Sequence, residues 1–396
     1  MFDPKSVWTT AVIASLVALG PLSTDMYLPA FPALVLAFGA RMNQVQQTLS
    51  IFLVGFALAQ LLYGPLSDRF GRKPMLLAGM LLFLLSSIGA TLTQSIEQLS
   101  VLRLLQAIGG SAGPVLGRAM VRDIHGPAES ARLLSYIGTA MAVAPAVAPI
   151  AGGYLTLWYG WESVFLFLAI YAAAGIGMLS LRVPETAPPG SHHPLNPKAL
   201  LSGYRRLLKH PTWRWYTLCC AFSFSGLFSF LSGSAFVIIN YYGYREEQFG
   251  LLFALVVIGY MCGTLIAGRL VRTQGIDRLL GSGAMIAAVS GAVMAILAVA
   301  EVHSVWAVIV PQTLYMLGTG IVMPQSMAGA LVPFPRMAGT ASALLGFVQM
   351  GLAALIGIVV GHYHDGGPLS MSLAIGIMGL MTLICYWLLR TSTPER

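Results

Sequence analysis

The chain has 396 residues, of which 57% are hydrophobic and 9% are charged, and its formal net charge is +8. Soluble globular proteins carry about 25% charged residues, so this composition excludes a soluble globule. The positive charge does not indicate nucleic-acid binding, because the Lys and Arg residues collect in segments between long apolar runs, where they face anionic lipid headgroups.

Apolar runs of about 20 residues predict membrane-spanning helices. With the N-terminus placed in the cytosol, only Arg41, Arg103 and Arg245 lie outside cytosolic segments, so the positive-inside rule predicts that both termini are cytosolic. The sequence therefore predicts an all-α membrane protein with twelve transmembrane helices. The expected spans are residues 8–30, 44–66, 75–94, 98–120, 131–156, 162–182, 213–237, 248–270, 279–300, 305–328, 337–361 and 370–389.

The first span contains Asp25, the one Asp or Glu of the chain that lies deep within an expected span. It follows Trp8 by 17 residues, about 25 Å along an ideal helix, which places it in the outer half of the membrane. Because a charged group within a bilayer is costly and usually faces a cavity or a partner, we expect Asp25 to be a proton carrier.

The second and third spans are joined by GPLSDRFGRKP, residues 64–74, a glycine-bounded segment rich in Arg and Lys. A basic turn between two spans is expected to lie in water on the cytosolic side. An ordinary short cytosolic loop would explain these charges, but not their order.

The fourth span contains Arg103, the only base embedded to a depth comparable with Asp25. We expect the two side chains to interact, directly or through water, which would keep the carboxylate charged, while desolvation acts in the opposite direction. The alternative is a static buried pair that only fixes helix packing.

The fifth span combines residues that bend a helix with residues that let helices approach closely. Pro145 and Pro149 each remove a helix hydrogen bond, and Gly138, Gly152 and Gly153 permit close packing. A bent, closely packed span of this kind is suited to act as a rocking surface, although an ordinary kinked helix has the same composition.

A long polar segment divides the chain into two six-helix halves of similar length. We expect an N-terminal six-helix bundle at 1–182, a cytosolic linker at 183–212 and a C-terminal six-helix bundle at 213–396. The second half carries Gly268 to Gly275, which shares the pattern G-x-L-x-x-x-x-G with Gly64 to Gly71. The matching position within each half predicts an internal repeat, so the two halves are expected to be pseudo-symmetric.

A binding cavity for lipophilic compounds should be largely apolar and aromatic, with few polar groups. Several side chains of the first, fourth, seventh, tenth and eleventh spans have this character. The alternative is that these aromatic and Met side chains face lipid or neighbouring helices instead of a cavity. Tyr27 in particular lies on a different face of its helix from Asp25. The candidate cavity residues are Tyr27, Gln106, Phe222, Phe224, Phe228, Tyr315, Phe347, Gln349 and Met350.

Several segments resemble signatures of a known transporter family. Residues 64–74 resemble the loop between helices 2 and 3 of the major facilitator superfamily of secondary transporters. Arg103-Leu104-Leu105-Gln106-Ala107 is similar to the superfamily's fourth-helix motif, whose Arg is implicated in proton coupling. Gly138 together with residues 144–153 resembles the fifth-helix antiporter motif, although Ala replaces the usual Gly before each Pro.

Other segments look like one group within that superfamily, the Bcr/CflA drug:proton antiporters, which are bicyclomycin and chloramphenicol resistance-like multidrug efflux proteins. These segments are residues 23–32, 222–231 and 337–342. Some relatives carry a second carboxylate two turns before the position of Asp25. Here that position is Val17, so proton coupling is expected to depend on fewer acids.

The resemblance implies roles for individual residues. Asp68 is expected to meet the N-terminal end of the eleventh span near Pro335 and Arg336, where a helix dipole favours negative charge. This contact between the halves would hold the outward-open state and break when the inner side opens. The residues of the conformational-switch loop are Gly64, Asp68, Arg69, Gly71, Arg72 and Lys73.

The expected function is proton-coupled antiport of small, largely lipophilic drugs and antibiotics, with protonation of Asp25 coupled to Arg103. The alternative is a proton-coupled exporter of one metabolite, such as an amino acid or a sugar-like compound. An enzyme would need clustered catalytic or metal-binding groups within the spans, and the sequence shows none. We therefore expect no catalytic site, no metal and no cofactor, with the proton gradient as the driving force.

The expected partners are small-molecule substrates, protons and membrane lipid, but not nucleic acid. The expected functional unit is a monomer. The expected location is the bacterial inner membrane.

Overall fold

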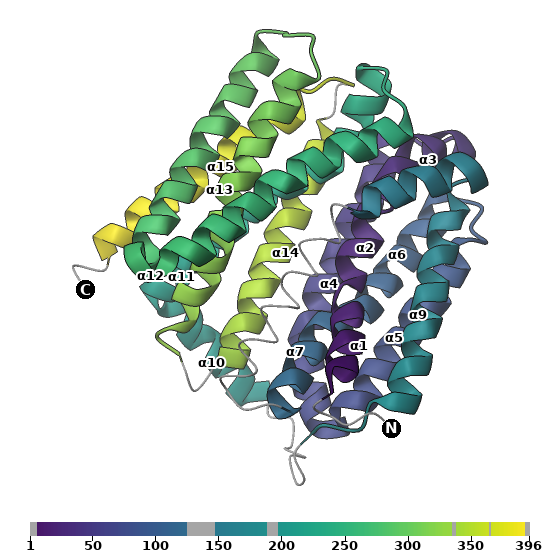
Figure 1. The fold of residues 1–396 in the computed structure, drawn as a ribbon, viewed down its shortest axis with the longest axis vertical. Helices are drawn as coiled ribbons and strands as arrows, with labels where there is room; N and C mark the ends of the chain where they lie inside the picture. Colours follow the sequence, from purple (N-terminus) through teal and green to yellow (C-terminus); the bar gives the residue numbers. More distant parts are fainter. Residues whose placement is uncertain (1–5, 125–146, 188–196, 335–337, 364–365, 393–396) are drawn as a thin grey trace. The chain divides into compact units, whose positions relative to one another are not determined.

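The computed structural model describes residues 6–124, 147–187, 197–334, 338–363 and 366–392. All regular elements within these ranges are helical (Figure 1). Ten helical stretches of this part of the chain are long and apolar enough to cross a membrane. The structure therefore confirms the all-α membrane class predicted from composition.

Two of the predicted spans, 248–270 and 279–300, belong to one continuous stretch, α12 (Glu246–Val299), which is interrupted by non-helical geometry at Gly275. Most of the predicted fifth span, including Gly138 and Pro145, lies outside the described residues. Its described part, 147–159, is helical. Each of the other predicted spans corresponds to one of the remaining helical stretches.

The helices before residue 197 are α1 (Val7–Val17), α2 (Leu19–Asp25), the 3-10 turn η1 (Leu28–Ala30), α3 (Phe31–Phe38), α4 (Met42–Phe70), α5 (Arg72–Ala90), α6 (Ile96–Gly110), α7 (Ala112–Ile124) and α9 (Glu162–Arg182). The later helices are α10 (Pro197–Lys209), α11 (Pro211–Ala235), the π-helix η2 (Phe236–Tyr241), α12, α13 (Trp306–Leu331), α14 (Ala338–His362) and α15 (Leu369–Ser392).

The first span is broken into short segments. The depth of about 25 Å that the sequence predicts for Asp25 assumes one continuous helix instead. Helix α2 ends at Asp25, and η1 follows three residues later. Pro29 and Pro32 occupy the first turns of η1 and α3, positions where the missing proline N–H costs nothing because those groups lack helical acceptors anyway. The broken geometry places Asp25 at a helix end, where polar groups of the backbone are not all used within the helix.

The predicted turn at 64–74 is largely helical. Helix α4 continues through Pro65 to Phe70, and α5 begins at Arg72, so Gly71 alone separates them. Gly71 has a φ of 97°, a conformation that disfavours residues with a Cβ atom. The turn is therefore shorter than the predicted segment, because the polar residues Ser67, Asp68 and Arg69 form the last turn of α4.

The internal repeat has a structural counterpart at its two aligned glycines. Gly275 of the second half also adopts a positive φ, 78°, with a ψ of 167°, close to the values of 97° and 153° at Gly71. Both glycines interrupt a pair of long helices at the same place in the repeat. The two aligned glycines thus adopt the same backbone conformation in each half.

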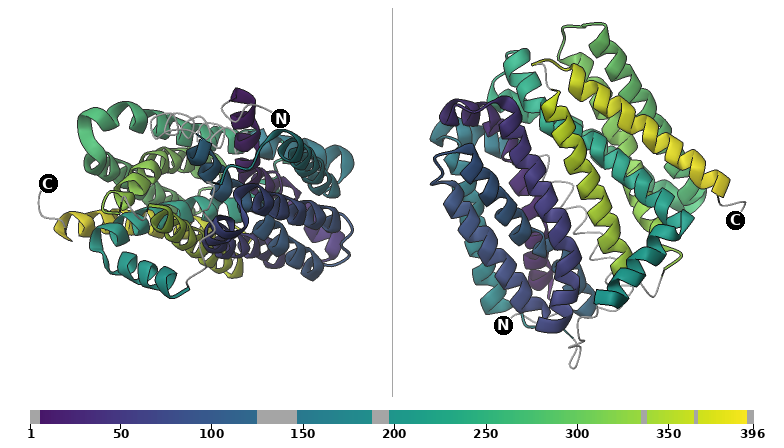
Figure 2. Two further views of the ribbon diagram at one scale, coloured as in Figure 1. Left: turned by 90° about the horizontal axis from the view of Figure 1, so that it is seen from below. Right: turned by 180° about the vertical axis from the view of Figure 1, so that it is seen from behind.

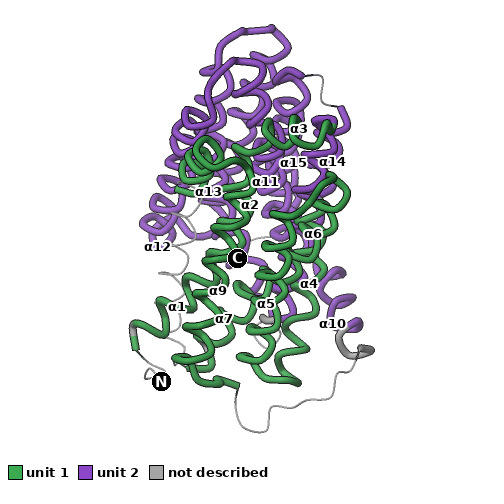
Figure 3. Tube along the Cα trace, turned by 90° about the vertical axis from the view of Figure 1, so that its right-hand side faces the viewer, with its two compact units in different colours: residues 1–40, 51–196 green, residues 41–50, 197–396 purple. Residues whose placement is uncertain are grey.

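The described chain separates into two compact units (Figure 3), of residues 1–40 with 51–196 and residues 41–50 with 197–396. In the first unit, α5 packs on α6 and α9, and α1 packs on α7. Helices α5 and α6 approach closely at Gly79 and Gly109, where a Cβ on Gly109 would lie 2.5 Å from the Gly79 carbonyl oxygen. Small residues allow such close packing between helices in a membrane.

In the second unit, α12 packs along α13 and α15, and α11 packs on α13, α14 and α15. The two views in Figure 2 show these long helices running side by side. Gly259 and Gly263 of α12 lie against backbone carbonyl groups of α13, so a side chain at either position would overlap the neighbouring helix. Both units therefore use glycine where two helices pack closely against each other.

Candidate functional site

Asp25 is buried within the first unit, with 4% of its surface exposed. Its Oδ1 atom accepts a hydrogen bond of 3.0 Å from the Thr24 hydroxyl group. Among the described residues, no Lys, Arg or His nitrogen lies within ion-pair distance of this carboxyl group. The first unit thus holds a buried carboxyl group that accepts a hydrogen bond from a hydroxyl group and, within the described residues, has no cation in contact.

Arg103 lies in α6 and is completely buried. Its Nη1 atom donates to the Ser23 carbonyl oxygen at 3.2 Å and to Gln106 Oε1 at 2.5 Å. No acceptor within the described chain bonds to its Nε and Nη2 atoms, although both are buried. One edge of the guanidinium group is therefore held, while the other retains two N–H donors.

Aromatic rings surround the Arg103 guanidinium group. Its Cζ atom lies 4.2 Å from the ring centre of Phe52, 4.5 Å from that of Tyr27 and 6.0 Å from that of Phe165. The face of an aromatic ring attracts a cation through its quadrupole, and more strongly when water is excluded. These rings help to offset the cost of burying a positive charge without a carboxylate in contact.

Gln106 connects Arg103 to α5. Its Nε2 atom donates to the Ser87 hydroxyl oxygen at 2.7 Å, and Ser87 donates in turn to the Phe83 carbonyl oxygen at 2.7 Å. Because Gln106 Oε1 accepts from Arg103, both ends of the amide have partners. The chain of hydrogen bonds fixes the Arg103 side chain relative to α2, α5 and α6.

The structure brings Arg103 to the short helix that ends at Asp25, and no direct contact of the two side chains occurs among the described residues. Arg103 instead binds the carbonyl oxygen of Ser23, two residues before Asp25 on the same short helix. An interaction of the two side chains through water stays a prediction. Phe52, Phe165 and Thr24 were not anticipated, since nothing in their local sequence distinguishes them from other residues of a span.

The described part of the fifth span packs against the residue that follows Asp25. Pro149, Gly152 and Gly153 are all buried. A Cβ atom on Gly152 would overlap the carbonyl oxygen of Met26. Gly152 therefore allows this helix to touch the backbone at the end of α2, directly beside the buried acid.

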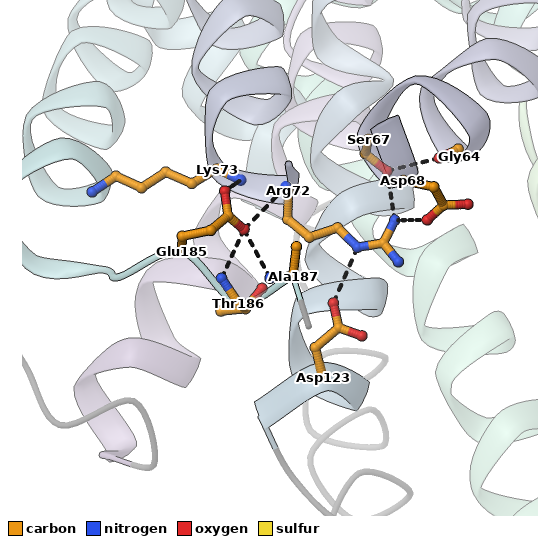
Figure 4. A network of polar contacts seen from close by, with 9 residues as sticks. All are labelled: Gly64, Ser67, Asp68, Arg72, Lys73, Asp123, Glu185, Thr186 and Ala187. Atoms are coloured by element: carbon orange, nitrogen blue, oxygen red, sulfur yellow. Dashed lines mark hydrogen bonds and ion pairs between the residues drawn. The ribbon is translucent and has the colours of Figure 1, made fainter. Parts of the chain in front are cut away.

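At the other end of the first unit, Arg72 organises a group of polar side chains (Figure 4). Its Nη1 atom lies 2.7 Å from Asp68 Oδ1 and 2.5 Å from Ser67 Oγ, and its Nε atom donates to Asp123 Oδ2 at 3.0 Å. Burial raises the pKa of the Asp123 carboxyl group, and the hydrogen bond from Arg72 opposes that shift. Arg72 thus ties the turn between α4 and α5 to the end of α7.

Glu185 completes this group and was not singled out from the sequence (Figure 4). Its carboxylate accepts from the backbone N–H groups of Arg72 and Lys73, each at 3.1 Å, and from those of Thr186 and Ala187. A carboxylate at a helix N-terminus satisfies unpaired donors and interacts favourably with the helix dipole. The available signal was an acid that follows Pro184, directly after a predicted span.

The remaining residues of the predicted switch loop have separate environments. The Lys73 ammonium group donates to the Ser180 carbonyl oxygen at 2.9 Å, and Arg69 is exposed with its guanidinium group over Phe70. The expected meeting of Asp68 with Pro335 and Arg336 falls on positions outside the described residues.

The predicted cavity residues divide between the two units. Tyr27 and Gln106 contact Arg103 in the first unit. In the second unit, Tyr315 is buried and donates to the Ser223 carbonyl oxygen at 3.2 Å, and buried Gln349 accepts from the Cys220 thiol at 3.5 Å. Phe228 is also buried, whereas Phe222, Phe224, Phe347 and Met350 are partly buried.

No group of three or more His, Cys, Asp or Glu side chains suited to hold a metal ion occurs in the ranges that the structure describes. The polar groups described above in the first unit are the buried acid Asp25, the buried base Arg103 and the group around Arg72.

Comparison with known proteins matches residues 13–358 to the Major Facilitator Superfamily. The chain is 34% identical to the chloramphenicol resistance protein of Pseudomonas aeruginosa, over 94% of this chain and 91% of that protein. It is 28% identical to multidrug resistance protein D of Escherichia coli, over 98% and 97%, and 29% identical to the bicyclomycin resistance protein homolog of Haemophilus influenzae, over 94% and 93%.

Solved structures show the same fold at low sequence identity. A D-xylose-proton symporter aligns with a TM-score of 0.76 and 16% identity, over 98% of each chain. A bacterial homolog of the human lysosomal transporter Spinster aligns with a TM-score of 0.74 and 13% identity, over 99% of this chain and 97% of that chain.

Proposed function

This chain belongs to the Major Facilitator Superfamily, a family of membrane transporters rather than enzymes, and we propose that it exports small, largely lipophilic drugs and antibiotics in exchange for protons. Three of the relatives are named for resistance to chloramphenicol, to bicyclomycin or to multiple drugs. The superfamily's secondary transporters use ion gradients and not bound cofactors. Those names support the substrate class, and the geometry around Asp25 supports the coupling ion.

The observation that carries the coupling proposal is the position of Arg103. Its guanidinium group binds the backbone of α2 two residues before Asp25, and its buried Nε and Nη2 atoms donate to no described residue. A deprotonated Asp25 needs donors, because an unpaired buried charge is costly. We propose that a shift of α2 against α6 brings the carboxylate and those donors together, directly or through water.

The proposed cycle follows from this pairing. A proton arriving from the outside neutralises Asp25 and releases it from Arg103, which expels the substrate and favours return to the inward-open state. Substrate from the cytosol then binds as the proton leaves. One titrating carboxylate suggests one proton per cycle, so that export of a neutral drug moves net charge.

We further propose that the protein lies in the bacterial inner membrane with both termini in the cytosol and functions as a monomer. We propose that its two bundles, 1–182 and 213–396, are joined by a cytosolic linker.

The test is proton release from acidified inverted vesicles when a compound is added. We expect chloramphenicol, cationic dyes or related lipophilic compounds to release protons through the wild-type protein, and Asp25→Asn to abolish the release. Glu97→Gln, which removes an exposed acid at the start of α6, is the matched control and should leave it intact. A response to one amino acid or sugar alone would instead favour a metabolite exporter, and equal release by Asp25→Asn would reject the coupling role.

A further inference from the structure

Helix α10 (Pro197–Lys209) lies outside the ten candidate spans and directly precedes the span that begins at Pro211. His210 separates the two helices and accepts a hydrogen bond from the backbone N–H of Trp213. Within the second unit, α10 packs against α11 and α14 at one end of both (Figure 1). Its position next to the start of a span places it at the level of a membrane surface.

One face of α10 is anchored to the protein. Gly203 and Leu207 are buried, and Leu207 belongs to a hydrophobic cluster with Trp213, Tyr216 and Phe334. Residues 203 and 207 are four apart and so share one side of a helix. This packed face fixes which side of α10 points away from the unit.

The outward side of α10 carries both apolar and basic side chains. Leu201 and Leu208, seven residues apart, are 70% and 49% exposed. Arg205, Arg206 and Lys209 are exposed beside them. The helix contains no Asp or Glu, and no ion pair joins these three cations to an acid anywhere in the described ranges.

Exposed leucines beside unpaired cations are the pattern of a helix that lies in the membrane interface. Neither water nor a bilayer core alone suits this face. In water the leucine side chains stay exposed, and in hydrocarbon the charged groups lose their hydration. The basic strip continues to the exposed Arg214, which stacks over Trp215 at 4.9 Å, and Trp residues concentrate at membrane interfaces.

We propose that α10 is a binding surface for anionic phospholipid. Arg205, Arg206 and Lys209 contact the lipid phosphate group, and Leu201 and Leu208 enter the upper acyl region. The acid-free strip selects an anionic headgroup over a zwitterionic one by charge complementarity. The proposal does not depend on the transported substrate or on proton coupling.

The experiment measures binding of phosphatidylglycerol and phosphatidylcholine to the purified full-length protein by native mass spectrometry. R205Q/R206Q/K209Q is compared with R269Q/R272Q/R278Q, which removes three exposed cations from the same unit. We expect the α10 variant to bind phosphatidylglycerol about a hundred-fold more weakly, because each cation near an anionic surface contributes a factor of about five. The control should retain most of the affinity.

Two further variants keep the proposal open to refutation if the first destabilises the protein. R205K/R206K/K209R preserves charge and should restore binding, while L201S/L208S should weaken binding of the lipid but not the preference for its headgroup. Equal loss in both glutamine variants, equal binding of the two lipids by the wild type, or full competition by inorganic phosphate would each overturn a specific lipid surface on α10.

Discussion

At the scale of single residues, Arg103 shows how a cation is stabilised where no carboxylate of the described chain touches it. Three aromatic rings surround the guanidinium group, one carbonyl and one amide oxygen bind Nη1, and the amide is itself anchored through Ser87. The planar, delocalised charge of Arg suits stacking and two-point hydrogen bonding. These features make Arg103 a fixed cation beside the acid that is proposed to titrate.

Arg103→Lys is expected to stop proton-coupled efflux even though the charge is preserved. A lysine ammonium group cannot stack on the rings and bind both oxygen atoms in the same geometry, and lost hydrogen bonds to a charged group cost about 1.5–3 kcal/mol each. We expect the efflux rate in vesicles to fall at least ten-fold, together with a lower unfolding midpoint. Arg278→Lys, at an exposed position, should change neither, and wild-type efflux by Arg103→Lys would contradict the geometric role.

The sequence was sufficient to select Asp25 and Arg103, because a charged residue within an apolar run stands out without any knowledge of the fold. It could not supply their partners. Arg103 and Ser23 are 80 residues apart, and Glu185 and Arg72 are 113 apart. Such contacts depend on how helices pack in three dimensions. A phenylalanine that covers a cation also has the same local sequence pattern as one that faces lipid, so the sequence does not distinguish them.

At the scale of elements, short helices and close backbone contacts shape the region around Asp25. The break after α2 exposes a helix end, and the helix at 147–159 reaches the Met26 carbonyl group because Gly152 has no side chain. The sequence predicts a single helix at 8–30. The structure instead has a longer helical stretch, Trp8–Phe38, which is broken into short segments near the prolines of this span. Hydropathy alone does not register such interruptions.

Gly152→Ala is expected to impair the protein, since the added Cβ atom meets backbone and not a flexible side chain. Overpacking of a tightly packed contact typically costs about 1–3 kcal/mol. We predict a lower unfolding midpoint in detergent and reduced efflux. Gly177→Ala in α9, where a Cβ atom would meet nothing within 4 Å, is the matched control and should be neutral. Equal behaviour of the two variants would argue against a close contact at Gly152.

At the scale of the whole molecule, hydropathy predicted where most spans lie, and the aligned glycines Gly71 and Gly275 show that the repeat extends to backbone conformation. The turn regions were predicted less well. Pro65 lies inside α4 and the 64–74 segment is mostly helical, because a charged last turn at the membrane surface is compatible with a helix. The two-bundle organisation with a linker at 183–212 stays a prediction.

The central claim is that Asp25 couples transport to protons without being needed for the fold of the substrate site. The most direct measurement compares wild type and Asp25→Asn in proteoliposomes, recording gradient-driven accumulation of a transported drug together with its equilibrium binding. We predict that Asp25→Asn loses accumulation under an imposed pH gradient while drug binding stays within a few-fold of the wild type. Accumulation by Asp25→Asn at the wild-type rate and to the wild-type level would contradict the account.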